Sequence, residues 1–122
     1  MGDIERELQR AQKALEVATN LITQGYCDDA ANRLYYAAFH AARASLWRHN
    51  PDLQVKTHKG VLALFGRELV LKGKAPEECT ALLSRLSKIR EKADYAGGGV
   101  DCGSLRRSLP GVRRMVRHAQ GP

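Results

Sequence analysis

The sequence predicts an all-α fold, an up-and-down antiparallel bundle of about five helices. Apolar residues recur at intervals of three and four along most of the chain, and no strand-like alternation is found. The longest segments are rich in residues that favour helix, and the 122 residues include only four prolines. Short loops between the expected helices imply antiparallel neighbours. A chain of this length is expected to form one helical domain over residues 1–122.

The first two helices are expected at residues 3–24 and 28–49. The first carries one apolar stripe on a polar helix, and Gly25 should end it. The second is rich in alanine on one face, which would let a neighbouring helix approach closely. Asp28 or Asp29 is expected to cap its first turn, because a carboxylate accepts hydrogen bonds from free backbone amides there.

Two further helices follow after a loop. The third should begin at a cap formed by Thr57 and end near Lys72, before a glycine. The fourth has Pro76 in its first turn, where the missing amide donor costs nothing. It should end at the three glycines of residues 97–99.

The last helix, expected at residues 104–119, is strongly basic. Residues 102–122 contain five arginines and no acid, so they supply +5 of the net charge of +7. This charge suits a polyanionic partner, nucleic acid ahead of a membrane surface, or it is only a solvated helix face. Pro110 either kinks this helix or marks its true start.

The three cysteines are odd in number and widely spaced, so Cys27, Cys79 and Cys102 are expected to be small buried thiols. No His, Cys or carboxylate pair has the spacing of metal ligands, so neither a metal nor a cofactor is predicted. No apolar run approaches the length of a membrane span, and the N-terminus has no hydrophobic signal region. A cytoplasmic protein without membrane contact is expected.

One face of the second helix carries a mixed polar and aromatic stripe made of Asn32, Tyr36, Phe39, Arg43 and Trp47. Such a stripe suits a protein interface or a surface on which nucleotide bases stack. The alternative is that its aromatic rings simply belong to the core.

A second segment with candidate functional side chains lies at the end of the fourth helix. Arg90 borders the apolar stripe there, and Asp94 lies four residues on, within reach of a charge-assisted pair. The pair is either purely structural, or it is a phosphate-binding arginine held in place by a carboxylate.

Three segments resemble a known family. They are GYCDDAANRLYYAAFHAARA at 25–44, THKGV at 57–61 and REKADY at 90–95. Together they resemble the HEPN superfamily (higher eukaryotes and prokaryotes nucleotide-binding domain), in particular its short stand-alone prokaryotic branch. The resemblance implies a bundle of four or five helices that often dimerises and places two copies of an arginine motif in one cleft.

The resemblance also carries expectations about function. Many members are metal-independent endoribonucleases, and many prokaryotic ones are toxins encoded beside a small nucleotidyltransferase that acts as antitoxin. In some pairs the antitoxin modifies a tyrosine near the motif. The nuclease motif would place a histidine where this chain has Tyr95. A phenol with a pKa near ~10 is a poor base at neutral pH.

Three hypotheses therefore stay open. In the first, the chain is a non-catalytic or weakly catalytic module that binds a nucleotide or RNA and works with a nucleotidyltransferase. The candidate catalytic residues of the site are Arg90, Asp94 and Tyr95, and its candidate binding residues are Asn32, Arg33, Tyr36 and Arg90. In the second, it is a toxin ribonuclease in which His40 or His58 supplies the proton. In the third, it is a protein-interaction scaffold. A homodimer is expected.

Overall fold

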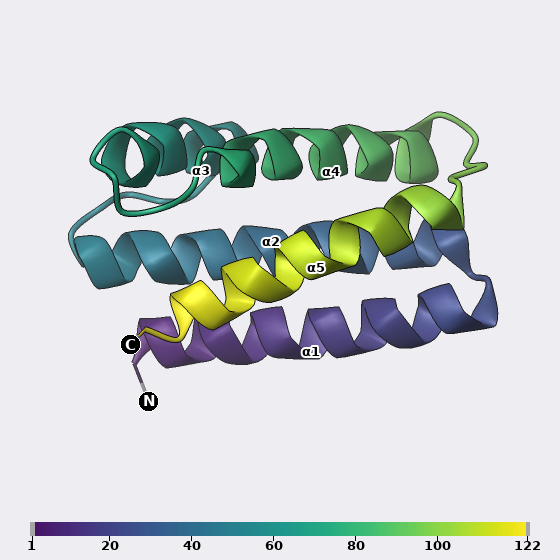
Figure 1. Ribbon diagram of the computed structural model, residues 1–122, viewed down its shortest axis with the longest axis horizontal. Coiled ribbons are helices and arrows are strands. Elements are labelled where there is room, and N and C mark those ends of the chain that lie inside the picture. Colours follow the sequence, from purple (N-terminus) through teal and green to yellow (C-terminus); the bar gives the residue numbers. More distant parts are fainter. Residues whose placement is uncertain (1, 122) are drawn as a thin grey trace.

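Four long helices run back and forth along one axis, and both chain ends lie at the same end of the bundle (Figure 1). The structure, a computed structural model, describes residues 2–121, and within that range it contains helices and no strand. The long helices are α1 (Asp3–Gln24), α2 (Cys27–His49), α4 (Glu78–Tyr95) and α5 (Cys102–Ala119). The all-α antiparallel bundle predicted from the sequence is therefore confirmed.

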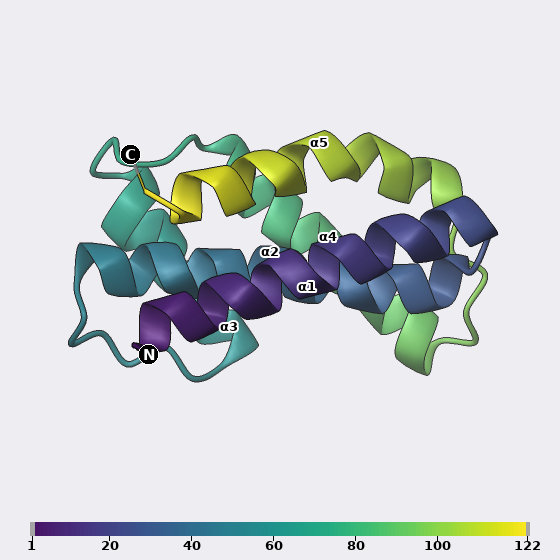
Figure 2. The same cartoon turned by 90° about the horizontal axis from the view of Figure 1, so that it is seen from below.

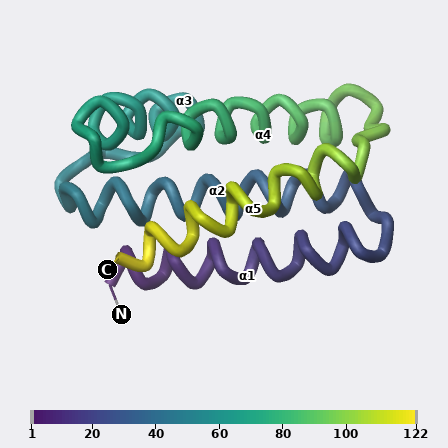
Figure 3. The backbone as a smooth tube through the Cα atoms, viewed as in Figure 1, coloured from purple at the N-terminus to yellow at the C-terminus, as the bar shows by residue number. Residues whose placement is uncertain are grey.

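Helix α2 is the centre of the bundle. It lies between α1 and α4, and α5 crosses the bundle diagonally (Figures 1 and 3). Its buried alanines let α1 and α5 come close, since a methyl side chain adds little thickness to a helix. The alanines buried on α2 are Ala30, Ala31, Ala37, Ala38, Ala41, Ala42 and Ala44.

The segment between α2 and α4 departs from the single α-helix that was predicted. It begins as α3 (His58–Leu64), and the Thr57 side chain caps it by accepting a hydrogen bond from the Gly60 amide at 2.9 Å. It then widens into the π-helix η1 (Phe65–Val70). Periodicity alone does not separate these two forms, because both keep Phe65 and Leu69 facing the core.

The predicted cap of α2 is wrong. Neither Asp28 nor Asp29 caps the helix. The Asp28 carboxylate instead accepts hydrogen bonds from the backbone amides of Gly99 at 3.3 Å and Val100 at 2.9 Å. It thereby fastens the glycine loop that follows α4. The loop lies beside the start of α2 only in the folded chain, so no local pattern announces this role.

Helix α5 begins two residues earlier than predicted, at Cys102. Asp101 caps it, accepting a hydrogen bond from the Gly103 amide at 2.9 Å. Pro110 lies inside the helix with its ring exposed, so it does not mark the start. A ring that points away from the core leaves the packed face of the helix intact.

The expectation of three free thiols is wrong for two of the cysteines. Cys27 and Cys102 form a disulfide, with their Cα atoms 5.1 Å apart and a sequence separation of 75 positions. They are the first residues of α2 and α5, which the bundle brings together. Cys79 is free and half-buried. Within the described range, every helix is too short or too polar to cross a bilayer.

Candidate functional site

The last turns of α4 place Arg90 against α2. Its side chain is 11% exposed, which is low for an arginine. The guanidinium carbon lies 5.0 Å from the centroid of the Tyr35 ring and 5.9 Å from those of Tyr36 and Tyr95. Aromatic faces attract a cation at these distances, so three rings fix where the charge lies.

A chain of polar contacts ties Arg90 to α2. Arg90 Nη1 lies 3.6 Å from Asp94 Oδ2, and the Asn32 amide donates a hydrogen bond to the same oxygen at 3.1 Å. Arg33 in turn donates to Asn32 Oδ1 from Nε at 2.9 Å and from Nη2 at 2.6 Å. The guanidinium of Arg33 also lies over the Tyr36 ring, 5.2 Å from its centroid.

The residues singled out from the sequence thus come together in one place. We call them the Arg90 cluster; its members are Asn32, Arg33, Tyr36, Arg90, Asp94 and Tyr95. They were found from helical spacing within α2 and α4 and from the family resemblance, and the bundle supplies the contact between the two helices.

Arg90 is held in its charged form. Burial disfavours the charge, but a hydrogen bond with the Tyr95 hydroxyl and the nearby Tyr36 and Tyr35 phenols outweigh it, so the pKa of Arg90 is raised. Its Nε is buried and has no hydrogen-bond partner among the described residues. The cluster therefore combines a permanent positive charge with an unused donor.

Tyr35 and His58 extend the site behind Arg90, and sequence reasoning missed the tyrosine. Burial raises the pKa of Tyr35 to about 12, so its hydroxyl keeps its proton; this hydroxyl lies 2.6 Å from His58 Nδ1. Burial, and then the charges of Arg90 and His40, lower the pKa of His58. His58 is therefore neutral at pH 7. The sequence feature that could have indicated Tyr35 is its position among the buried alanines of α2, one residue from the aromatic stripe.

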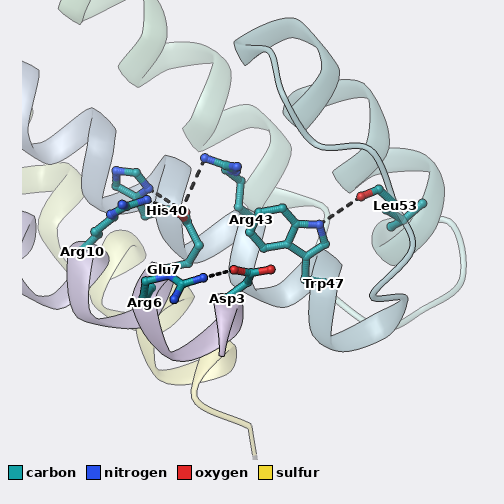
Figure 4. A network of polar contacts seen from close by, with 8 residues as sticks. All are labelled: Asp3, Arg6, Glu7, Arg10, His40, Arg43, Trp47 and Leu53. Carbon is teal, nitrogen blue, oxygen red and sulfur yellow. Dashed lines mark hydrogen bonds and ion pairs between the residues drawn. The ribbon is translucent and has the colours of Figure 1, made fainter. Parts of the chain in front are cut away.

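A second polar network lies between α1 and α2, and it includes His40, a candidate proton donor, and Arg43 of the aromatic stripe (Figure 4). Glu7 is only 2% exposed, and its carboxylate lies 2.7 Å from His40 Nδ1, 2.9 Å from Arg10 Nη1 and 3.6 Å from Arg43 Nη1. Burial opposes its ionisation, but the His40 hydrogen bond and the charges of His40 and Arg43 outweigh burial and lower the pKa of Glu7.

Position 7 carried a signal that was not used. It lies three residues after Ile4 and four before Ala11, on the apolar stripe of α1, where a carboxylate needs partners once buried. In the structure His40 is a hydrogen-bond partner of Glu7, so a residue of α1 holds the His40 side chain in place.

The aromatic stripe of α2 is divided between core and site. Phe39 is 5% exposed and belongs to the core, as the simpler alternative proposed. Trp47 is half-buried, and its indole donates to the Leu53 carbonyl at 3.0 Å (Figure 4). Arg43 lies over both rings, 5.6 Å and 4.7 Å from the centroids of Phe39 and Trp47. Little of the stripe is left free for an interface.

Comparison with known proteins identifies the family of the chain. The family model described as "HEPN domain" matches residues 4–119. A UPF0332 protein of Gloeobacter violaceus is 36% identical over 95 residues, which cover 78% of this chain and 74% of that protein. Two proteins of Methanocaldococcus jannaschii, named "Putative toxin MJ0605" and "Putative toxin MJ0142", are 36% and 29% identical. Each alignment covers 76% of this chain, with 71% and 62% of the relatives. The chain therefore belongs to the HEPN domain family.

Proposed function

We propose that this protein is a HEPN-type nucleotide- or RNA-binding module whose Arg90 cluster binds phosphate, and that it works with a nucleotidyltransferase partner in a toxin-antitoxin-like pair. The observation that carries the proposal is the state of Arg90. Three aromatic rings fix the position of its desolvated charge. The distance of 3.6 Å between Arg90 Nη1 and Asp94 Oδ2 is longer than a close charge-assisted hydrogen bond. A guanidinium has five N–H donors, so donors stay free for phosphate oxygens.

The surroundings of Arg90 support nucleotides over a bare anion. The Tyr95 residue is 77% exposed although it contacts Arg90, so its ring has a free face on which a base can stack. Asn32 and Asp94 orient the guanidinium, and Arg33 adds a second positive charge beside Tyr36. The same exposure makes the Tyr95 hydroxyl accessible to an enzyme that modifies tyrosine.

Binding is tested by thermal unfolding with mononucleotides and with short single-stranded RNA. A ligand that binds only the folded chain must raise its melting temperature. Arg90→Ala should remove this rise. Lys88→Ala is the matched control, because it removes one exposed charge from the opposite face of α4. An equal rise in wild type and Arg90→Ala would refute the binding site.

The partnership is tested in cells. The names of two relatives contain the word toxin, and this supports growth arrest as the phenotype to look for. Expression of the chain should arrest growth, and an adjoining nucleotidyltransferase gene, when co-expressed, should relieve the arrest. Relief that persists with Tyr95→Phe would exclude modification of this hydroxyl as the mechanism. The expected homodimer is checked by sedimentation equilibrium.

A second candidate function, a metal-independent endoribonuclease, is favoured by one observation. His58 is neutral, and Tyr35 holds its Nδ1 near Arg90. In such an enzyme His58 would take the proton of the RNA 2′-hydroxyl as the oxygen attacks phosphorus, Arg90 would stabilise the charge on the phosphorane, and the 5′-oxygen would leave. Tyr95 would donate a proton or hydrogen bond to the leaving oxygen.

The two functions give different results with one pair of variants. His58→Asn should abolish RNA cleavage measured in the presence of EDTA and leave RNA binding intact if the protein is a nuclease. Arg90→Ala should reduce both. If wild-type protein binds RNA and does not cut it under any of these conditions, the binding module stands and the nuclease falls.

A further inference from the structure

A second site lies away from the Arg90 cluster, between the first turns of α4 and the part of α5 from Arg107 onward. A groove of about 700 Å³ opens here, a volume within the range of binding sites in proteins. Helices α4 and α5 both pack mainly on α2, and they meet each other over a short stretch only, so a furrow is left between them. Figures 1 and 2 show α5 crossing the bundle at an angle to α4.

The floor of the groove is apolar. Phe65 of η1, Leu82 of α4 and Met115 of α5 line it, and the half-buried thiol of Cys79 lies among them. Gly111 leaves this space open, because a Cβ atom at that position would lie 2.8 Å from Leu82 Cδ2 and the end of the Leu82 side chain would have to shift. Water solvates an apolar groove poorly, so covering it with the apolar face of a helix is favourable.

The rim of the groove is positive. Arg85 and Arg114 line it, and neither forms an ion pair within residues 2–121. Arg107 adds a third charge and only approaches Asp101, at 3.9 Å. The one acid at the rim is Glu78. The rim thus offers cations on both sides of the apolar floor.

We infer that this groove binds an acidic amphipathic helix of another protein. The apolar face of such a helix would cover Leu82 and Met115, and its carboxylates would pair with Arg85 and Arg114. Charge decides between this occupant and a second copy of the chain. A symmetric dimer through this face would place the arginines of one α5, which has no acid, against those of its partner.

The floor argues against nucleic acid as the occupant. Single-stranded nucleic acid stacks its bases on exposed aromatic rings, whereas the one ring in the floor, Phe65, is 2% exposed. Leu82 and Met115, which are 6% and 4% exposed, line the rest of the floor, and their aliphatic carbon and sulfur atoms match leucine-type side chains.

The probe is a fluorescein-labelled designed peptide of about four helical turns, with leucines on one face and glutamates on the other. Fluorescence anisotropy should show saturable binding, and the same peptide with lysine in place of glutamate should not bind. Arg85→Glu/Arg114→Glu should weaken binding at least about tenfold. The matched control is Lys88→Glu/Arg113→Glu, which changes the net charge equally at exposed sites outside the groove and should leave binding unchanged.

Cys79 gives an independent readout, since the other two cysteines are in the disulfide. Saturating peptide should slow alkylation of its thiol by iodoacetamide. The inference is overturned if no peptide binds, if both double variants lose binding equally, or if Cys79 reacts at an unchanged rate in the complex. It is also overturned if a short RNA displaces the peptide and protects Cys79. Neither readout depends on Arg90, so the proposed function stands or falls separately.

Discussion

Asn32 on α2 donates a hydrogen bond to Asp94 on α4 at 3.1 Å, and the two residues are 62 positions apart in the sequence. The same Asp94 oxygen lies 3.6 Å from Arg90. Asn32 is therefore a positioning residue: it fixes the carboxylate that orients the guanidinium. Arg33 holds the amide from the other side.

Asn32→Ala should lower the free energy of unfolding by about 1 kcal/mol, because it removes the donor to Asp94 and the acceptor for Arg33. Urea unfolding measures this. A double-mutant cycle with Asp94→Ala should give a coupling energy of about 0.5–1 kcal/mol. Gln12→Ala, an exposed change on α1, serves as the control and should have no effect. A coupling energy of zero would mean that the contact does not orient Asp94.

Glu7 should make the protein sensitive to acid. Its pKa is lower in the folded chain than in the unfolded chain, so the unfolded chain takes up the proton first as the pH falls. The stability that Glu7 provides is complete at neutral pH and is lost as the pH drops through about 4.3 and below. Thermal unfolding followed between neutral pH and this range should show the loss.

Glu7→Gln isolates this contribution. It keeps the shape of the side chain and removes the charge that His40, Arg10 and Arg43 share, so we expect a loss of about 2–3 kcal/mol at pH 7. The difference between the variant and wild type should shrink in acid, where the native carboxylate is itself protonated. Glu16→Gln, exposed on the same helix, is the control. A difference that is independent of pH would contradict this account.

Local contacts were predictable from the sequence, and distant ones were not. The periodicity of α1 and a glycine at its end gave that helix its bounds, because both signals act within a few residues. Arg90 and Asp94 share a helix face, so their pairing followed from a spacing of four residues. The family resemblance, not spacing, indicated that they meet Asn32.

The contacts that were missed all depend on how helices pack. The pairs Glu7–His40 and Tyr35–His58 join residues 33 and 23 positions apart, and Cys27–Cys102 joins the starts of two helices. No local pattern distinguishes such partners, because each member alone is consistent with an ordinary surface or core position. For Glu7, only its place on an apolar stripe indicated that a partner was required.

The disulfide between Cys27 and Cys102 should contribute strongly to stability. It closes a loop across 75 positions, and the loss of chain entropy in the unfolded state corresponds to about 4 kcal/mol. Urea unfolding of oxidised and reduced protein should differ by this order. Cys27→Ser should be as unstable as the reduced protein. In Cys79→Ser the reductant should lower the free energy of unfolding by as much as it does in wild type. Equal stability with and without reductant would show that this link does not stabilise the fold.

The pKa of His58 should report the charge of Arg90. Burial and the cations Arg90 and His40 lower it, so the unfolded chain takes up the proton first, and the stability that neutral His58 provides is lost as the pH falls through about 6.5. Arg90→Gln removes one cation and should raise the pKa of His58, which NMR titration of the ring Cε1 proton measures. Lys88→Gln, on the opposite face of α4, should leave it unchanged. If both variants gave the same titration curve, Arg90 and His58 would not act in one electrostatic site, and the nuclease candidate would lose its base.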